Sequence, residues 1–403
     1  MSALSAFFRL TPGQGLKEYF EAKYLDPAAG IDWAAPSARL VSSLKAKVDE
    51  MPDAQRDQLV LDADRIKSLS DEAGRNALQA VANSDQSYGE IQSDWHRALM
   101  ILLHHPQTFR LAEEVRHHDR HREGRMWSAF EIPAGTKLTR DAPSVAAFQN
   151  AVRDLYDGRN VEVDIFNRCR LDCSGHRRQL LQVALYRESA PVDTLEFVGD
   201  EAALQRRVVR PVIEVALTYE EETGAIEVVA AKLPNREDLA DAMVRHLLEA
   251  ECPAQPVVPR RYDLSVLLRP FEFPTDPCDG IAEVVVNELR LVDTHQPGER
   301  LDLAVTRNAR RNIWDMAKDR LGLNATSQRA SGPSDAPAWS IRCAKFSIKF
   351  LPAGRSGSQR CLTFKISVPH GSTLRSMTER ERLIGERYLA RWGILKPVNA
   401  RRV

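Results

Sequence analysis

The stretch HHPQTFRLAEEVRHHDRHREGR, residues 104–125, holds five of the ten histidines in this chain of 403 residues. Histidine titrates near neutral pH, so it serves both as a metal ligand and as a proton-transfer group. If the stretch is helical, Glu113, His117 and His121 follow one another at four-residue spacing and share one face. The sharper hypothesis is a Glu, His, His metal or proton-transfer site, as in a metal-dependent hydrolase or nuclease.

The same stretch also fits the polar end of a helix. Pro106 restricts His105 away from the α region, so one helix should end and another begin at this point. The unpaired carbonyls of a last turn favour His and Arg, and the turn before Gly124 reads HHDRHR. A metal-binding H-E-x-x-H motif is absent. The pattern favours a solvated helix end, with the metal site as the alternative.

Linear motifs of phosphate binding and nucleophilic catalysis are missing from the chain. It has no G-x-x-x-x-G-K-[ST], no strand-associated G-x-G-x-x-G and no G-x-S-x-G. We therefore predict no cofactor and favour a non-catalytic binding or regulatory protein over an enzyme.

Positive charge is concentrated toward the carboxy-terminal end. The whole chain has 56 basic and 56 acidic residues, yet residues 301–403 hold 20 lysines and arginines against 7 aspartates and glutamates. Such a field can neutralise nucleic-acid phosphates without reading base sequence. The candidate phosphate contacts are Arg342, Lys345, Lys349, Arg355, Arg360 and Lys365.

Other partners would suit the same charge. An acidic protein surface would attract it, and so would the acidic residues 126–260 of the chain itself. Trp314, Trp339 and Trp392 could stack on bases if exposed, although Trp392 also fits a helix core. We predict nucleic acid or an acidic protein surface as partner for the basic part and a protein partner for the helical part. A complex subunit that binds only protein is the alternative.

The elements that position these residues follow from hydrophobic periodicity. Leu40, Leu44 and Val48 recur four apart, which predicts a helix with one buried face. From about residue 126 the hydrophobic pattern changes. Apolar and polar residues alternate in residues 161–165, which predicts half-buried strands. The later elements expected are strands near 281–292, 301–306, 339–351 and 361–368, and helices near 308–321 and 378–392.

These elements predict an α+β protein in three parts. Prolines at 253, 256 and 259 stiffen the chain and indicate a linker. We expect a helical domain at 1–125, an acidic antiparallel α+β domain at 126–252 and a basic antiparallel α+β domain at 262–403.

Compartment is predicted from three absences in the sequence. No segment approaches the roughly 20 apolar residues of a membrane-spanning helix. The amino terminus MSALSAFFRL lacks the basic flank and long apolar core of a secretory signal. The six cysteines are scattered rather than dense. We expect a cytoplasmic protein without membrane association.

Overall fold

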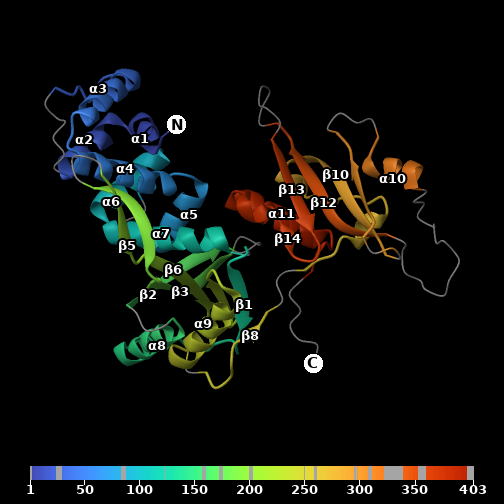
Figure 1. Ribbon diagram of the computed structural model, residues 1–403. Coiled ribbons are helices and arrows are strands. Elements are labelled where there is room, and N and C mark those ends of the chain that lie inside the picture. Colours follow the sequence, from blue (N-terminus) through green and yellow to red (C-terminus); the bar gives the residue numbers. More distant parts are fainter. Residues whose placement is uncertain are drawn as a thin grey trace. The chain divides into compact units, whose positions relative to one another are not determined.

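The computed structural model of the chain contains two compact units (Figure 1). Unit 1 comprises residues 1–171 and 177–256, and unit 2 comprises residues 172–176 and 257–403. The structure describes residues 2–23, 30–82, 88–122, 124–156, 160–171, 176–198, 203–248, 250–257, 261–294, 296, 298–306, 311–321, 339–352 and 360–396.

The fold class is α+β, as predicted: helices come first, and antiparallel sheets with interspersed helices follow. The boundary that we expected between residues 125 and 126 falls inside unit 1. The helical segment and the first sheet therefore belong to one compact unit.

Unit 1 opens with the helices α1 to α7. Their bounds are α1 (Ala3–Leu10), α2 (Gly13–Ala22), α3 (Ser37–Asp49), α4 (Asp53–Ser68), α5 (Glu72–Val81), α6 (Asp94–His104) and α7 (Pro106–His121). The buried residues of α3 are the predicted stripe of Leu40, Leu44 and Val48. The helix break at His105 is also confirmed, since α6 ends and α7 begins on either side of it.

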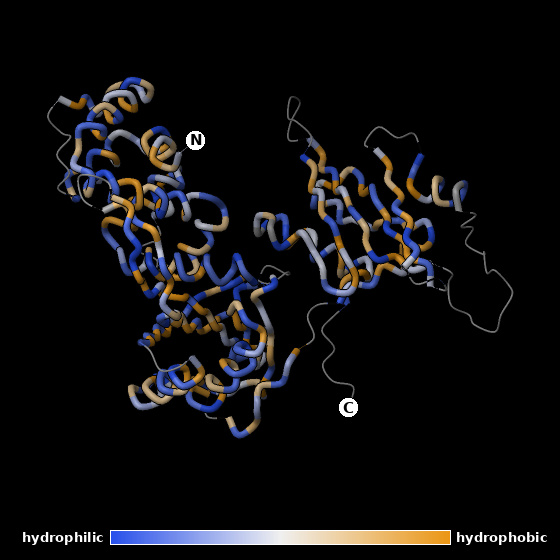
Figure 2. The backbone as a smooth tube through the Cα atoms, in the orientation of Figure 1, coloured by the Kyte–Doolittle hydropathy of each residue, from blue (hydrophilic) through white to orange (hydrophobic). Residues whose placement is uncertain are grey.

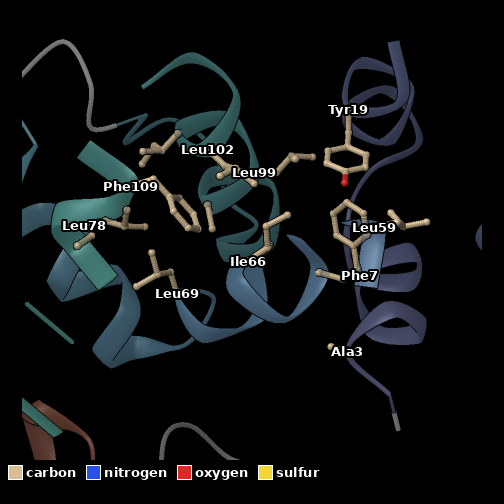
Figure 3. Packing of buried hydrophobic residues seen from close by; sticks show 14 of the residues in the cluster. Ala3, Phe7, Tyr19, Leu59, Ile66, Leu69, Leu78, Leu99, Leu102 and Phe109 are labelled. Atoms are coloured by element: carbon tan, nitrogen blue, oxygen red, sulfur yellow. The ribbon is translucent and has the colours of Figure 1, made fainter. Parts of the chain in front are cut away.

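The helices enclose a core rich in aromatic and branched side chains (Figure 3). Phe7 packs edge to face on Tyr19 with ring centroids 5.4 Å apart, an arrangement that the ring quadrupoles favour. The Tyr19 hydroxyl donates to Oδ2 of the fully buried Asp62 at 2.9 Å. Gln58 donates to Oδ1 of Asp62 at 3.0 Å, and the Lys23 ammonium lies 3.2 Å from Oδ2. These partners offset the cost of burying a carboxylate.

Sheet A follows the helices and has the strand order β2-β3-β6-β7-β1-β8, with every pair antiparallel. Its strands are β1 (Trp127–Glu131), β2 (Val161–Leu171), β3 (Arg177–Glu188), β6 (Val212–Glu220), β7 (Ala225–Val229) and β8 (Gln255–Pro256). The strands β6 and β7 form a hairpin. Gly224 turns it with φ +73°, and a Cβ there would lie 2.1 Å from the carbonyl oxygen of Ile132.

The two faces of sheet A are covered by different helices. On one face α8 (Ala142–Leu155) and α9 (Leu233–His246) bury an apolar core with the strands. On the other face α5 and α7 contact the sheet, and Phe166 of β2 and Ala184 of β3 belong to the core of the helical segment. A shared core explains why helices and sheet form one unit.

The helices α8 and α9, which cover one face of sheet A, begin in similar ways. Asp141 is the N-cap of α8 and accepts from the Ser144 amide at 2.7 Å. α9 begins after Lys232. In both helices a proline occupies the first turn, where its missing N–H costs no hydrogen bond.

Unit 2 is built on sheet D, with the antiparallel order β11-β10-β12-β13-β14. Its elements, with the small β9–β15 pair and three short helices, are β9 (Arg261–Tyr262), η2 (Ser265–Leu268), η3 (Pro277–Asp279), β10 (Ile281–Asp293), β11 (Arg300–Ala304), α10 (Ile313–Leu321), β12 (Trp339–Phe350), β13 (Cys361–Ser367), β14 (Gly371–Ser372), η4 (Leu374–Ser376), α11 (Glu379–Arg391) and β15 (Leu395–Lys396). The predicted strands and the helix near 378–392 are confirmed with small shifts at their ends. The helix predicted near 308–321 is confirmed from Ile313 onward, and residues 307–310 lie outside the described residues.

The core of unit 2 lies between sheet D and its helices. Phe346 of β12 stacks on Trp392 at a centroid distance of 6.1 Å, next to the buried Tyr388 and Leu389 of α11. The apolar residues recur along the strands of both sheets (Figure 2). Within the described ranges, no helix is both long and apolar enough to cross a membrane.

A separate two-stranded sheet completes unit 1. It consists of β4 (Val192–Val198) and β5 (Ala203–Val209), which pair antiparallel with each other. We call this pair of strands, residues 192–198 and 203–209, the β-arm.

Candidate functional site

Three predicted phosphate contacts, Lys345, Lys349 and Lys365, lie on the outer face of sheet D, opposite its core. Lys345 pairs in register with Lys365 across the two strands, so the two side chains share a face. Lys349 is two pairs further along the same ladder, opposite Cys361. The structure therefore brings these three lysines together on one surface.

The same surface carries the carboxylates that neutralise them. Lys345 donates to Oε1 of Glu288 at 2.8 Å, and Lys365 lies 3.6 Å from its Oε2. Lys349 donates to Oε2 of Glu283 at 2.6 Å. Both glutamates come from β10, which lies in register beside β12. The hydrogen bond from Lys345 holds the pKa of Glu288 below its usual range, so the carboxylate is ionised at neutral pH.

The remaining predicted contacts are mixed. Arg360 donates to Oε1 of Glu381 at 3.1 Å and lies over the Phe350 ring, 5.7 Å from its centroid. Arg342 is exposed on β12. Arg355 lies outside the described residues. Four of the six predicted cations thus already have an acidic partner within the chain.

The tryptophans proposed for base stacking are tied into the fold. Trp392 is buried and its indole N–H donates to the carbonyl of Pro274 at 3.1 Å. Trp314 is half-buried and donates to the carbonyl of Leu267 at 2.9 Å. Trp392 is therefore a core residue, and the indole N–H groups of both are engaged.

The alternative site of Glu113, His117 and His121 is brought together only in part. The rings of His117 and His121 lie 4.9 Å apart. Glu113 instead accepts a bidentate pair of hydrogen bonds from Arg65 of α4, at 2.9 and 2.7 Å. In the part of the chain that the structure describes, no three His, Cys, Asp or Glu side chains are grouped to hold a metal ion. This geometry does not favour the metal hypothesis.

The end of α7, which we had expected to be solvated, is solvated on one side only: Asp119 and Arg120 are exposed, whereas the other side packs on the second face of sheet A. His118 is fully buried there, and Glu227 of β7 lies 3.5 Å from its Nε2. Neither ring nitrogen has a hydrogen-bond partner in the described part of the chain. Burial lowers the pKa of His118 to about 3, so the ring is neutral at physiological pH.

Charged groups from α7 and from the strands surround His118. Asp119 accepts two hydrogen bonds from the buried Arg168, at 2.8 and 2.7 Å. Glu227 lies 2.9 Å from Arg170 and accepts from Arg122 at 2.8 Å. We call this group of six residues the α7–sheet network: His118, Asp119, Arg122, Arg168, Arg170 and Glu227.

The network keeps its acids ionised despite their surroundings. Burial opposes ionisation, yet the charges of Arg168 and Arg170 hold the pKa of Asp119 well below its usual range. In the same way, Arg122 and Arg170 outweigh burial and lower the pKa of Glu227. A general acid or base works best with a pKa near the operating pH, and the pKa values of His118, Asp119 and Glu227 are all lowered away from it. The network is suited to joining α7 to the sheet rather than to proton transfer.

The sequence contained a signal for this network that we misread. Asp164 and Arg168 lie on the same side of β2 as the buried Phe166, because strand side chains alternate. A half-buried strand, as we predicted for residues 161–165, would turn that side toward solvent, but Arg110 of α7 pairs with Asp164 at 2.6 Å. The polar face of α7 therefore contacts the polar face of β2 instead of water.

The β-arm is the other feature that we did not predict. It continues the β3–β6 ladder, whose last pair joins Glu188 to Val212. Pro191 and Pro211 interrupt the ladder, since proline has no N–H to donate. Beyond them the arm pairs from Val192 and Val209 to its tip and extends past sheet A (Figure 1).

One face of the β-arm is apolar and open to solvent. Cross-strand partners share a face, so the pairs Phe197–Leu204, Leu195–Arg206 and Asp193–Val208 lie on the same side. The four apolar side chains of this arm face are exposed to 57% (Leu195), 74% (Phe197), 58% (Leu204) and 72% (Val208).

Charge on the β-arm is balanced. Asp193 and Arg206 form an ion pair on the arm face. Arg207 and Glu196 form another on the opposite side, at 3.2 Å. The arm therefore presents apolar surface with charges of both signs at its edge.

Comparison with known proteins adds no assignment. Neither a protein-family model nor a curated protein matches this chain. The function must be argued from the surfaces themselves.

Proposed function

We propose that this chain is a non-catalytic binding protein, a subunit of a protein complex, and that the β-arm is its contact surface. The observation that carries the proposal is the exposed apolar arm face. Single exposed apolar residues are common, but contiguous ones on a projecting element are characteristic of interaction sites.

The energetics of a hairpin support this proposal. A two-stranded hairpin is marginally stable in water and gains stability when a third strand or another surface packs on it. The described residues of the β-arm bury almost none of their apolar side chains within unit 1. A partner that covers the arm face would supply the missing burial, at about 25 cal/mol for each Å² of apolar surface removed from water.

The state of the basic residues supports a protein partner over nucleic acid. The lysines already form ion pairs with Glu283 and Glu288. When a phosphate approaches, either these ion pairs break or the carboxylates stay close to the phosphate. Nucleic-acid binding by unit 2 remains the second candidate, because Arg342 is exposed and residues 301–403 carry an excess of positive charge.

The test compares complexes isolated with the unaltered chain and with an arm variant. Phe197→Ser with Leu204→Ser removes the apolar character of the arm face. The matched control is Leu61→Ser on α4, because Leu61 is as exposed as Leu204, at 58%. We expect a stoichiometric protein partner with the unaltered chain and the control, and its loss with the arm variant. Identical protein partners for all three would contradict the proposal.

A further inference from the structure

We infer that the β-arm face packs against the same face of a second copy of this chain, related by a two-fold axis that runs along the arm. This inference rests on the proposed function and names its partner. Most soluble oligomers are symmetric, and a two-fold interface requires a surface that is complementary to itself.

The order of residues along the arm meets this requirement. A two-fold axis parallel to the strands places β4 of one copy over β5 of the other, with both tips at the same end. Phe197 then faces Leu204 of the partner subunit, and the reverse contact forms at the same time. The largest and most exposed apolar side chain of the face is thus covered by an apolar side chain in each half of the interface.

Charge on the arm face is also complementary to itself. Asp193 lies at the base of β4, and Arg206 lies two residues further toward the tip on β5. With β4 over the partner's β5, Asp193 comes within reach of the long side chain of Arg206 of the partner subunit. The symmetric contact is identical, so each acid meets a base. A partner of one charge sign would instead place a like charge beside Asp193 or Arg206.

The first experiment measures the mass of the full chain in solution by sedimentation equilibrium over a wide range of protein concentration. We expect a reversible dimer, whose dissociation constant rises at least tenfold for Phe197→Asp, about the 1.4 kcal/mol that a tenfold change represents. Leu61→Asp should leave it unchanged. A chain that stays monomeric at every concentration, or a dimer indifferent to Phe197→Asp, would overturn the inference.

The second experiment tests the two-fold arrangement by mixing two charge variants. Asp193→Arg alone and Arg206→Asp alone each place like charges across the interface, so each should dimerise more weakly than the unaltered chain. Mixing them restores opposite charges at both contacts between subunits, while the pair within each arm stays broken. We expect heterodimers that are tighter than either homodimer. If the mixture associates no better than its components, the arrangement is wrong.

The two experiments separate this inference from the proposed function. If the chain is monomeric but a different protein is lost from the arm variant during isolation, the second copy is wrong and the proposed function stands. If the arm variant keeps every protein partner and its dimer, both fail.

Discussion

His118 is a fully buried side chain among charges, and its neutral form is the one that the fold accommodates. In the unfolded chain a histidine takes up a proton near pH 6.5, whereas burial lowers the pKa of His118 to about 3 in the fold. The stability that this group contributes is therefore complete above pH 6.5 and is lost as the pH falls from there toward 3.

The first prediction follows from the lowered pKa of His118. From pH 7 to about pH 5 the free energy of unfolding should fall by about 2 kcal/mol because of His118 alone. Urea unfolding of the unaltered chain and of His118→Asn at both pH values measures it. Burial also lowers the pKa of His96 and of His121, but both remain in the variant, so the difference between the two slopes isolates His118. Equal acid sensitivity of the two proteins would refute the prediction.

Asp119 carries the second prediction at the residue scale. Asp119→Ala leaves the buried Arg168 guanidinium with Gln182 as its remaining side-chain partner, at 2.8 Å. Removing one member of a buried pair costs about 3–5 kcal/mol, and we expect about 3 kcal/mol because Asp119 is partly exposed.

The control for Asp119 is an exposed ion pair of similar composition. Asp53 pairs with Arg56 on the surface of α4. Asp53→Ala should change the free energy of unfolding by less than about 1 kcal/mol, as exposed pairs do. Chemical denaturation of both variants makes the comparison, and similar losses for the two would show that the α7–sheet network does not hold Asp119 in the way described.

At the scale of elements, sheet D shows why the three lysines that we predicted as phosphate contacts on β12 and β13 are paired with carboxylates. Glu288 precedes Lys345 by 57 residues, and Glu283 precedes Lys349 by 66. Only the pairing of β10 with β12 brings them together. Counting charges along residues 301–403 therefore could not reveal neutralisation by a strand that lies before them.

A third prediction tests nucleic-acid binding on this face. Glu283→Gln with Glu288→Gln would release Lys345, Lys349 and Lys365 without altering the strands. If unit 2 binds nucleic acid through these lysines, the variant should bind more tightly than the unaltered chain, with a steeper salt dependence. We expect weak binding by the unaltered chain in a fluorescence salt titration. Tight binding that the double substitution leaves unchanged would contradict the importance of the ion pairs.

A helix was predictable where a single apolar face packs on a single hydrophobic core. The stripe of α3 was readable from apolar spacing, and the break before α7 was readable from Pro106. The end of α7 was not, because its polar side meets a polar face of sheet A, and periodicity does not distinguish such a face from solvent. The β-arm was missed because both its faces mix apolar and charged residues, so the alternation that marks a half-buried strand is weak.

At the scale of the whole chain, unit 1 joins helices and sheet through a common core, and the domain division that we predicted can be tested directly. Residues 1–125 alone would lack Phe166 and Ala184, which complete the helical core, and the sheet that covers His118. The fragment should therefore not unfold cooperatively.

Residues 1–256 and residues 257–403 correspond to the two units and should each unfold in a single cooperative transition. Circular dichroism with thermal melting of the three fragments is the measurement. A cooperative melt of residues 1–125 at the temperature of the full chain would show instead that the helical part is a domain of its own.

The claim that the β-arm is the contact surface is tested most directly by hydroxyl-radical footprinting of the full chain in its isolated assembly and after the assembly is dissociated. We expect Phe197 and Leu204 to be modified slowly in the assembly and quickly after dissociation, while Leu61 is modified equally in both. Equal modification of Phe197 before and after dissociation would contradict it.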